Sequence, residues 1–235
     1  MNSIRLNQIR ESERKSHIET YSNEELYKEG SWLTKPVKTV LDLIPLFEDY
    51  KELNVLDLGS GVGRNSIAIA QHYPNISCNI DCIDILELAI EKLKINAKKY
   101  NVSSSINGIV KPIEAYTISP NKYDLILAVS ALEHIDSKES FIQKLQEIKH
   151  GIREKGIVCL VINSNIKEHD KRTGEALPPQ FEVNISTEEL QTLLDQTFTN
   201  WQIIKSTTQT QQYDIPRENL VSTLQTTVVT LVARK

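Results

Sequence analysis

The chain has little that would place it outside the cell or in a membrane. Only 3 of its 235 residues are cysteines, and they lie in strand-like runs: Cys78, Cys82 and Cys159. An odd number of core-type cysteines is typical of a reducing compartment and provides no disulfide framework. No apolar run approaches the length of a transmembrane helix, and residues 1–16 lack the apolar centre of a secretory signal. We therefore expect a cytoplasmic protein without a membrane partner.

An excess of positive charge is also missing. The formal net charge is −4, so a broad electrostatic grip on nucleic acid is not expected. The three cysteines and five histidines show no metal-ligand spacing, so we predict no metal site. We find no internal repeat, and the sequence does not distinguish a monomer from a homodimer.

The informative stretch is a glycine turn between a strand and a helix. Asn54–Leu58 reads as a buried strand that carries Asp57 near its end, and the spacing Gly-x-Gly-x-Gly follows at once. Glycine permits positive φ and lets a ligand approach the backbone closely. The third glycine comes one residue earlier than in the dinucleotide fingerprint, and a carboxylate at Asp57 would repel a pyrophosphate. The turn therefore predicts a ligand with an ammonium group and no phosphate.

Apolar runs and helical stripes alternate along most of the chain. Strands are predicted at 54–58, 80–85, 106–110, 123–129, 157–162, 201–204 and 226–233. Helices are predicted after Thr34, over 86–100, from Asp136 towards Gly156, and over 188–194. Alternation of this kind favours a parallel sheet with helices on both faces. Residues 163–185 read as a long loop, and the last two strands, with no helix between them, are expected to pair antiparallel.

Asp84 ends the second strand, 21 residues after Gly63. A carboxylate at this point can accept hydrogen bonds from both hydroxyls of a ribose. Asp is also a preferred helix cap, so Asp84 is alternatively the N-cap of the helix over 86–100.

Together these features resemble motif I of the class I S-adenosylmethionine (SAM) methyltransferases. The resemblance implies an α/β fold, a Rossmann-like three-layer sandwich whose mostly parallel seven-stranded sheet ends in an antiparallel hairpin. It implies SAM as cofactor and S-adenosylhomocysteine as product, with Asp57 near the SAM amino group. The cofactor residues that it implies are Asp57, Gly59, Ser60, Gly61, Gly63, Asn65, Asp84, Ile85, Ile113, Glu114, Val129 and Ser130. The methyltransferase domain would cover 31–235, and the polar segment 1–30 would form a helix or lid over it.

Residues 32–36 (Trp-Leu-Thr-Lys-Pro), the Gly-Arg-Asn-Ser run from Gly63 and the chain's last five residues are similar to the tellurite-resistance methyltransferase group. That likeness implies a small acceptor, such as a chalcogen oxyanion or a thiol. His134, in Glu133-His134, is a candidate general base or a pocket-shaping residue. Arg217 is a candidate catalytic residue in the loop between the last two strands.

Residues 129–132 lack the Asn/Asp-Pro-Pro-aromatic and Pro-Cys motifs of nucleic-acid and protein-amide methyltransferases. We therefore predict a SAM-dependent methyltransferase with a small-molecule acceptor and in-line displacement. The alternatives are a SAM-binding regulatory module without turnover and a dinucleotide-binding oxidoreductase.

Overall fold

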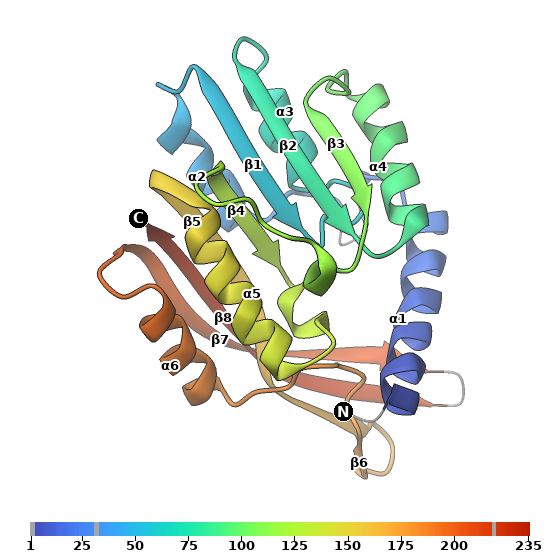
Figure 1. Cartoon of the computed structure of the whole chain (residues 1–235). Helices are drawn as coiled ribbons and strands as arrows, with labels where there is room; N and C mark the ends of the chain where they lie inside the picture. The colour runs from blue at the N-terminus through green and yellow to red at the C-terminus, as the bar shows by residue number, and fades with distance from the viewer. Residues whose placement is uncertain (1–2, 31–32, 218–219) are drawn as a thin grey trace.

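The computed structural model describes residues 3–30, 33–217 and 220–235. Figure 1 shows strands and helices alternating from β1 to β5. The α-helices are α1 (Ser3–Asn23), α2 (Lys38–Leu43), α3 (Ser66–His72), α4 (Glu87–Lys99), α5 (Lys138–Gly151) and α6 (Thr187–Thr197). Short 3-10 helices are η1 (Ile44–Phe47), η2 (Ile113–Ala115) and η3 (Leu132–His134). The strands are β1 (Glu52–Leu58), β2 (Ser77–Asp84), β3 (Ile106–Val110), β4 (Tyr123–Val129), β5 (Ile152–Asp170), β6 (Ala176–Leu177), β7 (Gln202–Pro216) and β8 (Val221–Arg234).

One sheet organises the fold. Its strand order is β3-β2-β1-β4-β5-β8-β7, with the two-residue strand β6 paired to β5 off this path. The strands from β3 to β5 are parallel, whereas β8 and β7 are antiparallel. The predicted sheet with its terminal antiparallel hairpin is confirmed, and β6 is an additional strand. The order reverses between β1 and β4, the point at which open α/β sheets bind ligands beyond the carboxyl ends of their strands.

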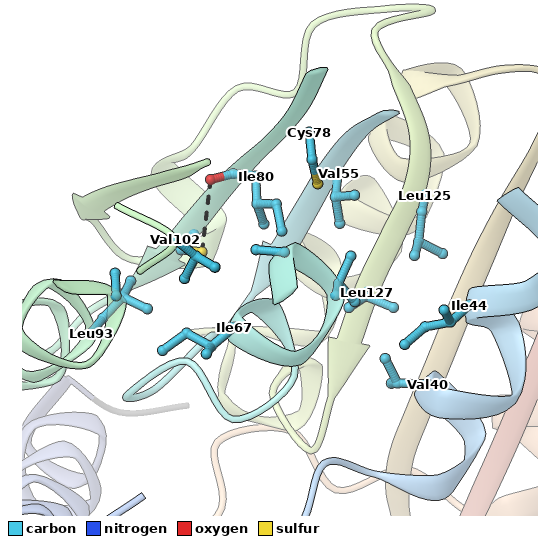
Figure 2. Close-up of a cluster of buried hydrophobic side chains, with 14 of the residues drawn as sticks. Val40, Ile44, Val55, Ile67, Cys78, Ile80, Leu93, Val102, Leu125 and Leu127 are labelled. Atoms are coloured by element: carbon cyan, nitrogen blue, oxygen red, sulfur yellow. Dashed lines mark hydrogen bonds between the residues drawn. The ribbon is translucent and has the colours of Figure 1, made fainter. Parts of the chain in front are cut away.

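Apolar cores fill both faces of the sheet. Val55 and Leu125 belong to the core that packs under α2, α3 and α4, whereas Leu56 and Ile126 belong to the core under α5 and α6. Figure 2 shows the first core, in which helix residues such as Ile67 meet the strand residues. Adjacent strand residues point to opposite faces, so a strand buried on both faces is apolar throughout. The three-layer sandwich is thereby confirmed, and the three cysteines are buried thiols, as predicted for core residues.

The antiparallel half extends much further than predicted. β5 continues through 163–170, which the sequence predicted as loop, and β7 pairs with β8 over nearly their full lengths. The residues over 205–214 are mostly Thr, Gln and Ser, and most of them are exposed because β7 is an edge strand. The polarity of these residues led to the prediction of a loop, although Thr is favourable in strands. This extension projects beyond the carboxyl edge of the parallel strands (Figure 1).

Three predicted helix boundaries were wrong. Thr34 is not a cap: α2 begins at Lys38 after Val37, while Thr34 Oγ1 donates to Lys28 O. The N-cap of α5 is Ser137, whose hydroxyl accepts from the Ser140 N–H, and not Asp136. α5 ends at Gly151, so the glycine predicted to end it lies within β5 instead. Ser31 and Trp32, which precede the predicted cap, lie outside the described residues.

The polar N-terminal segment forms the helix α1. It lies along the edge at which the parallel strands end, and it reaches the far end of the β7–β8 extension (Figure 1). The two sheet halves and α1 therefore surround the carboxyl ends of β1, β2 and β4. None of the described helices is long and apolar enough to cross a membrane.

Candidate functional site

The turn after β1 forms the base of the site. Its φ angles are left-handed at three glycines, +74° at Gly59, +54° at Gly61 and +92° at Gly63. The N–H groups of Gly59 and Ser60 donate to Ile83 O at 2.8 and 3.0 Å, which ties the turn to β2. A Cβ on Gly59 would collide with Ala131 after β4. The glycines thus allow the ends of three strands to meet.

Asp84 closes this turn from the end of β2. It is 9% exposed, and its Oδ2 accepts the Gly61 N–H at 2.8 Å while Oδ1 accepts the Leu86 N–H at 2.9 Å. Burial raises the pKa of Asp84, an effect that the two backbone donors partly oppose. Helix α4 begins at Glu87 with Leu86 as its cap, so Asp84 is not its N-cap. Each carboxylate oxygen can accept a further hydrogen bond.

A cavity of about 1110 Å³ opens above these strand ends. Most of the predicted site residues line it: Gly59, Ser60, Gly61, Asn65, Asp84, Ile85, Ile113, Glu114, Val129, Ser130 and His134. The Ser60 hydroxyl is buried and has no hydrogen-bond partner among the described residues. Ser130 holds a left-handed φ of +49°, and its N–H donates to Val161 O. Strained non-glycine backbone of this kind is concentrated at ligand sites.

Two predicted residues lie beneath the cavity rather than on its wall. Gly63 faces Leu93 and Ile67, so it serves packing. The carboxylate of Asp57 is 2% exposed and accepts the Ser66 hydroxyl at 2.5 Å. Burial is the largest cause that raises the pKa of Asp57 to about 6, and the nearby Asp84 adds to it. When it is ionised, Asp57 therefore carries a poorly solvated negative charge under the turn, and its side chain does not line the cavity.

Glu114 is held by the N-terminal helix. Arg10 Nη2 of α1 donates to Glu114 Oε1 at 2.6 Å, and Arg10 Nε lies 3.6 Å from Glu182 Oε1. Helix α1 also places His17 and Tyr21 on the cavity wall, with their rings stacked at 5.4 Å. A Cβ on Gly61 would lie 2.9 Å from the Tyr21 hydroxyl. The cavity is thus roofed by α1.

His134 lines the cavity from η3, after β4. Its Nδ1 lies 3.1 Å from Glu182 Oε2, and its ring stacks on Phe181 with centroids 5.0 Å apart. The neighbouring Glu133 carboxylate is buried and accepts from both the backbone and the side chain of Asn163. Burial raises the pKa of Glu133. The carboxylate that pairs with His134 is therefore Glu182, not the adjacent Glu133.

Arg217 does not reach the cavity. Its guanidinium donates to Glu168 Oε1 at 2.7 and 2.8 Å and to Gln180 Oε1 at 3.0 Å. Glu168 is buried and also accepts the Ser222 hydroxyl. The structure therefore gives no support to a catalytic Arg217, because this side chain neutralises a buried carboxylate in the extension.

Within the described part of the chain, no group of three or more His, Cys, Asp or Glu side chains is arranged to hold a metal ion.

A cavity at the switch point, with a glycine turn and an acid on the next strand, is typical of nucleoside-binding α/β proteins. Residues 49–215 match the sequence model of a family described as "Methyltransferase domain". The chain belongs to this methyltransferase family. The predicted membership of the methyltransferases is confirmed at this level, and the match does not extend to the narrower tellurite-resistance group.

Several curated methyltransferases are similar to the chain over part of their length. The chain is 35% identical over 135 residues to the release factor glutamine methyltransferase of Fusobacterium nucleatum subsp. nucleatum, covering 57% of this chain and 36% of that protein. It is 28% identical over 123 residues to a ubiquinone biosynthesis O-methyltransferase of Rickettsia canadensis, covering 52% and 48%. The chain thus spans between a third and a half of the length of the curated relatives it matches first.

A solved structure has a similar fold, in agreement with the predicted fold class. TehB from Haemophilus influenzae has a TM-score of 0.60 at 21% identity, covering 83% of this chain and 61% of that chain.

Several residues of the cavity wall were not predicted from sequence. Arg10 and Tyr21 come from α1, and Phe181 and Glu182 come from the segment after β6. The α1 residues follow helical spacing: Asn7, Arg10, Arg14, His17 and Tyr21 recur every three or four positions. That polar stripe would have identified one face of a cavity roof. No local pattern marks Glu182.

Proposed function

We propose that the chain binds SAM in this cavity and transfers its methyl group to a small molecule. The observation that carries the proposal is the junction of the Gly59–Gly61 turn with Asp84, at the switch point of the sheet. The bound cofactor would supply a methyl group that its own sulfonium activates. The protein would then align the acceptor and exclude water, and positioning of this kind contributes roughly 7–11 kcal/mol to lowering a barrier.

The cavity wall has groups that fit each part of SAM. Asp84 would accept the ribose hydroxyls, and Ile85 and Ile113 would flank the adenine. The unpartnered Ser60 hydroxyl and Ser130 would hold the methionine arm. The Asp57 carboxylate, beneath the turn, would attract the positively charged α-ammonium group electrostatically without contacting it.

Two features support SAM over a dinucleotide. The third glycine comes early, and the Asp57 carboxylate, with a pKa of about 6, is mostly ionised at neutral pH, where it would repel a pyrophosphate. A related fold, the N-methyltransferase NodS from Bradyrhizobium japonicum WM9, was solved with S-adenosyl-L-homocysteine; its TM-score is 0.58 at 14% identity.

A small acceptor fits the enclosure by α1. Residues 129–132 are Val-Ser-Ala-Leu, without the proline motif of amide methylation, so we do not extend the release-factor activity of the glutamine methyltransferase to this chain. The sequence likeness of residues 32–36 and of the Gly-Arg-Asn-Ser run to the tellurite-resistance group suggests a chalcogen oxyanion or thiol as the acceptor. However, Arg10 is already held between Glu114 and Glu182, and these carboxylates would repel an anion. An anionic acceptor is therefore the less favoured candidate.

Methyl-labelled SAM tests catalysis against mere binding. The purified chain is incubated with labelled SAM and a protein-free, small-molecule cell extract, and label is followed into both fractions. We expect label in small molecules with the wild-type chain and little with Asp84→Ala. Binding of SAM without label transfer would favour the regulatory module, and label in the protein fraction would contradict a small acceptor.

A further inference from the structure

A carboxylate–imidazole pair, Glu182 and His134, lines the cavity beside the end of β4. Glu182 is buried, with a side chain 1% exposed, and its Oε2 lies 3.1 Å from Nδ1 of His134. In a neutral imidazole, one nitrogen donates and the other accepts. Because a carboxylate accepts, the proton belongs on Nδ1, and Nε2 becomes the basic nitrogen.

Several contacts hold this pair in place. The Val183 N–H donates to Glu133 O at 2.9 Å, which pins the segment that carries Glu182 against η3. Phe181 stacks on the His134 ring with an interplanar angle of 26°. Arg10 of α1 lies 3.6 Å from the other oxygen of Glu182. The charged groups around His134 include Glu182, Arg10 and the buried Glu133.

The cavity wall formed by the antiparallel extension carries both apolar and polar side chains. Val161 of β5 and Leu224 and Val228 of β8 are apolar, whereas Asn163 of β5 and Gln211 and Tyr213 of β7 are polar. The orientation of Asn163 is fixed by Glu133 and Thr226. Such a wall suits a molecule that combines an apolar body with polar groups.

We propose that the acceptor is a neutral hydroxyl compound, that His134 is its general base, and that Glu182 is the positioning residue for His134. This inference rests on the proposed function. As the acceptor oxygen forms its bond to the methyl carbon, the carbon–sulfur bond breaks and its electron pair stays on sulfur. The hydroxyl proton passes to Nε2 of His134, and Glu182 stabilises the resulting imidazolium.

A pair of probes separates a base from a structural residue. Catechol presents a neutral hydroxyl that must lose a proton, whereas pyridine is a neutral nucleophile that has no proton to lose and needs no base. With SAM saturating, we expect His134→Asn to slow catechol methylation about 10²- to 10⁴-fold. Pyridine methylation should fall less than about 10-fold, because only positioning is disturbed. Equal losses with both probes would overturn the proposal, as would wild-type methylation of pyridine alone or of neither probe.

Glu182 is tested by a second readout that needs no turnover. In ¹⁵N-histidine spectra, we expect wild-type His134 to carry its proton on Nδ1, and Glu182→Gln to show mixed tautomers. The same variant should slow catechol methylation about 10- to 100-fold, the range of one charge-assisted hydrogen bond. Glu175→Gln, an exposed change in the same region, is the matched control and should behave as wild type.

Folding and cofactor binding are measured on every variant. Unchanged thermal unfolding and unchanged S-adenosylhomocysteine affinity by calorimetry assign the loss to proton transfer. A wild-type tautomer and rate in Glu182→Gln would overturn the role of Glu182. If the wild-type chain bound no SAM, the proposed function would fail first, and the two failures are thereby distinguished.

Discussion

Replacement of Asp84 by alanine separates cofactor binding from structural support. The carboxylate accepts the Gly61 N–H at 2.8 Å and the Leu86 N–H at 2.9 Å, and it also lines the cavity. If it accepts two ribose hydroxyls as well, Asp84→Ala removes four hydrogen bonds, two of them only in the complex. Stability and affinity should therefore both fall, for different reasons.

The magnitudes can be worked out separately. Hydrogen bonds to charged groups contribute roughly 1.5–3 kcal/mol each, and water that enters the gap replaces part of this. We expect SAM affinity to fall about 10- to 1,000-fold, or about 1.4–4 kcal/mol. Two buried N–H groups lose their acceptor in the free protein, which costs roughly 1–3 kcal/mol each before water compensates. Burial raises the pKa of Asp84, so removal of its charge offsets some of that loss.

Asp81→Ala is the matched control. Asp81 lies on the same strand and accepts from Lys122, Tyr123 and Asn107, outside the cavity. Calorimetry and thermal unfolding are measured on both variants. Asp81→Ala should lose stability with wild-type SAM affinity. If Asp84→Ala gave that same result, Asp84 would only close the turn, and the reasoning on ribose recognition would be refuted.

Three further predictions concern the turn and the extension. Burial raises the pKa of Asp57 from 3.8 to about 6. The folded protein therefore holds this proton more tightly than the unfolded chain, and the wild type loses free energy of unfolding as pH rises through this range. Asp57→Asn should therefore gain free energy of unfolding over wild type between about pH 4 and 6, by up to about 3 kcal/mol; a gain independent of pH would contradict this. Gly61→Ala should weaken SAM binding in calorimetry because its Cβ displaces Tyr21, and adding Tyr21→Phe should restore part of the affinity; no restoration would place the clash elsewhere. Arg217→Ala should lower the free energy of unfolding by about 3 kcal/mol, because Glu168 loses its buried partner, and leave SAM affinity unchanged; reduced affinity would return Arg217 to the site.

The parallel half of the fold could be predicted because its signals are local. Strands β3 and β4 match their predicted ranges, since each is an apolar run bounded by turn residues. The antiparallel extension could not, because the polar run over 205–214 becomes a strand only through pairing with β8. Cap positions failed for a related reason: several residues near Ser137 can cap a helix, and packing selects one of them.

The part of the cavity around the glycine turn was likewise predictable, and the part around His134 was not. Gly59, Gly61 and Asp84 lie at strand ends, and the order of a parallel sheet brings such ends together. Glu182 reaches His134 only because the segment after β6 folds back onto η3. For Asp57, the motif predicted the position at the end of β1 but not the direction of the side chain. The carboxylate contacts Ser66 and does not line the cavity.

Calorimetry of the purified chain with SAM, S-adenosylhomocysteine and NAD tests the central claim most directly. The geometry of the turn and Asp84 predicts that both sulfur nucleosides bind and that NAD does not. Binding of NAD without binding of SAM would contradict the account.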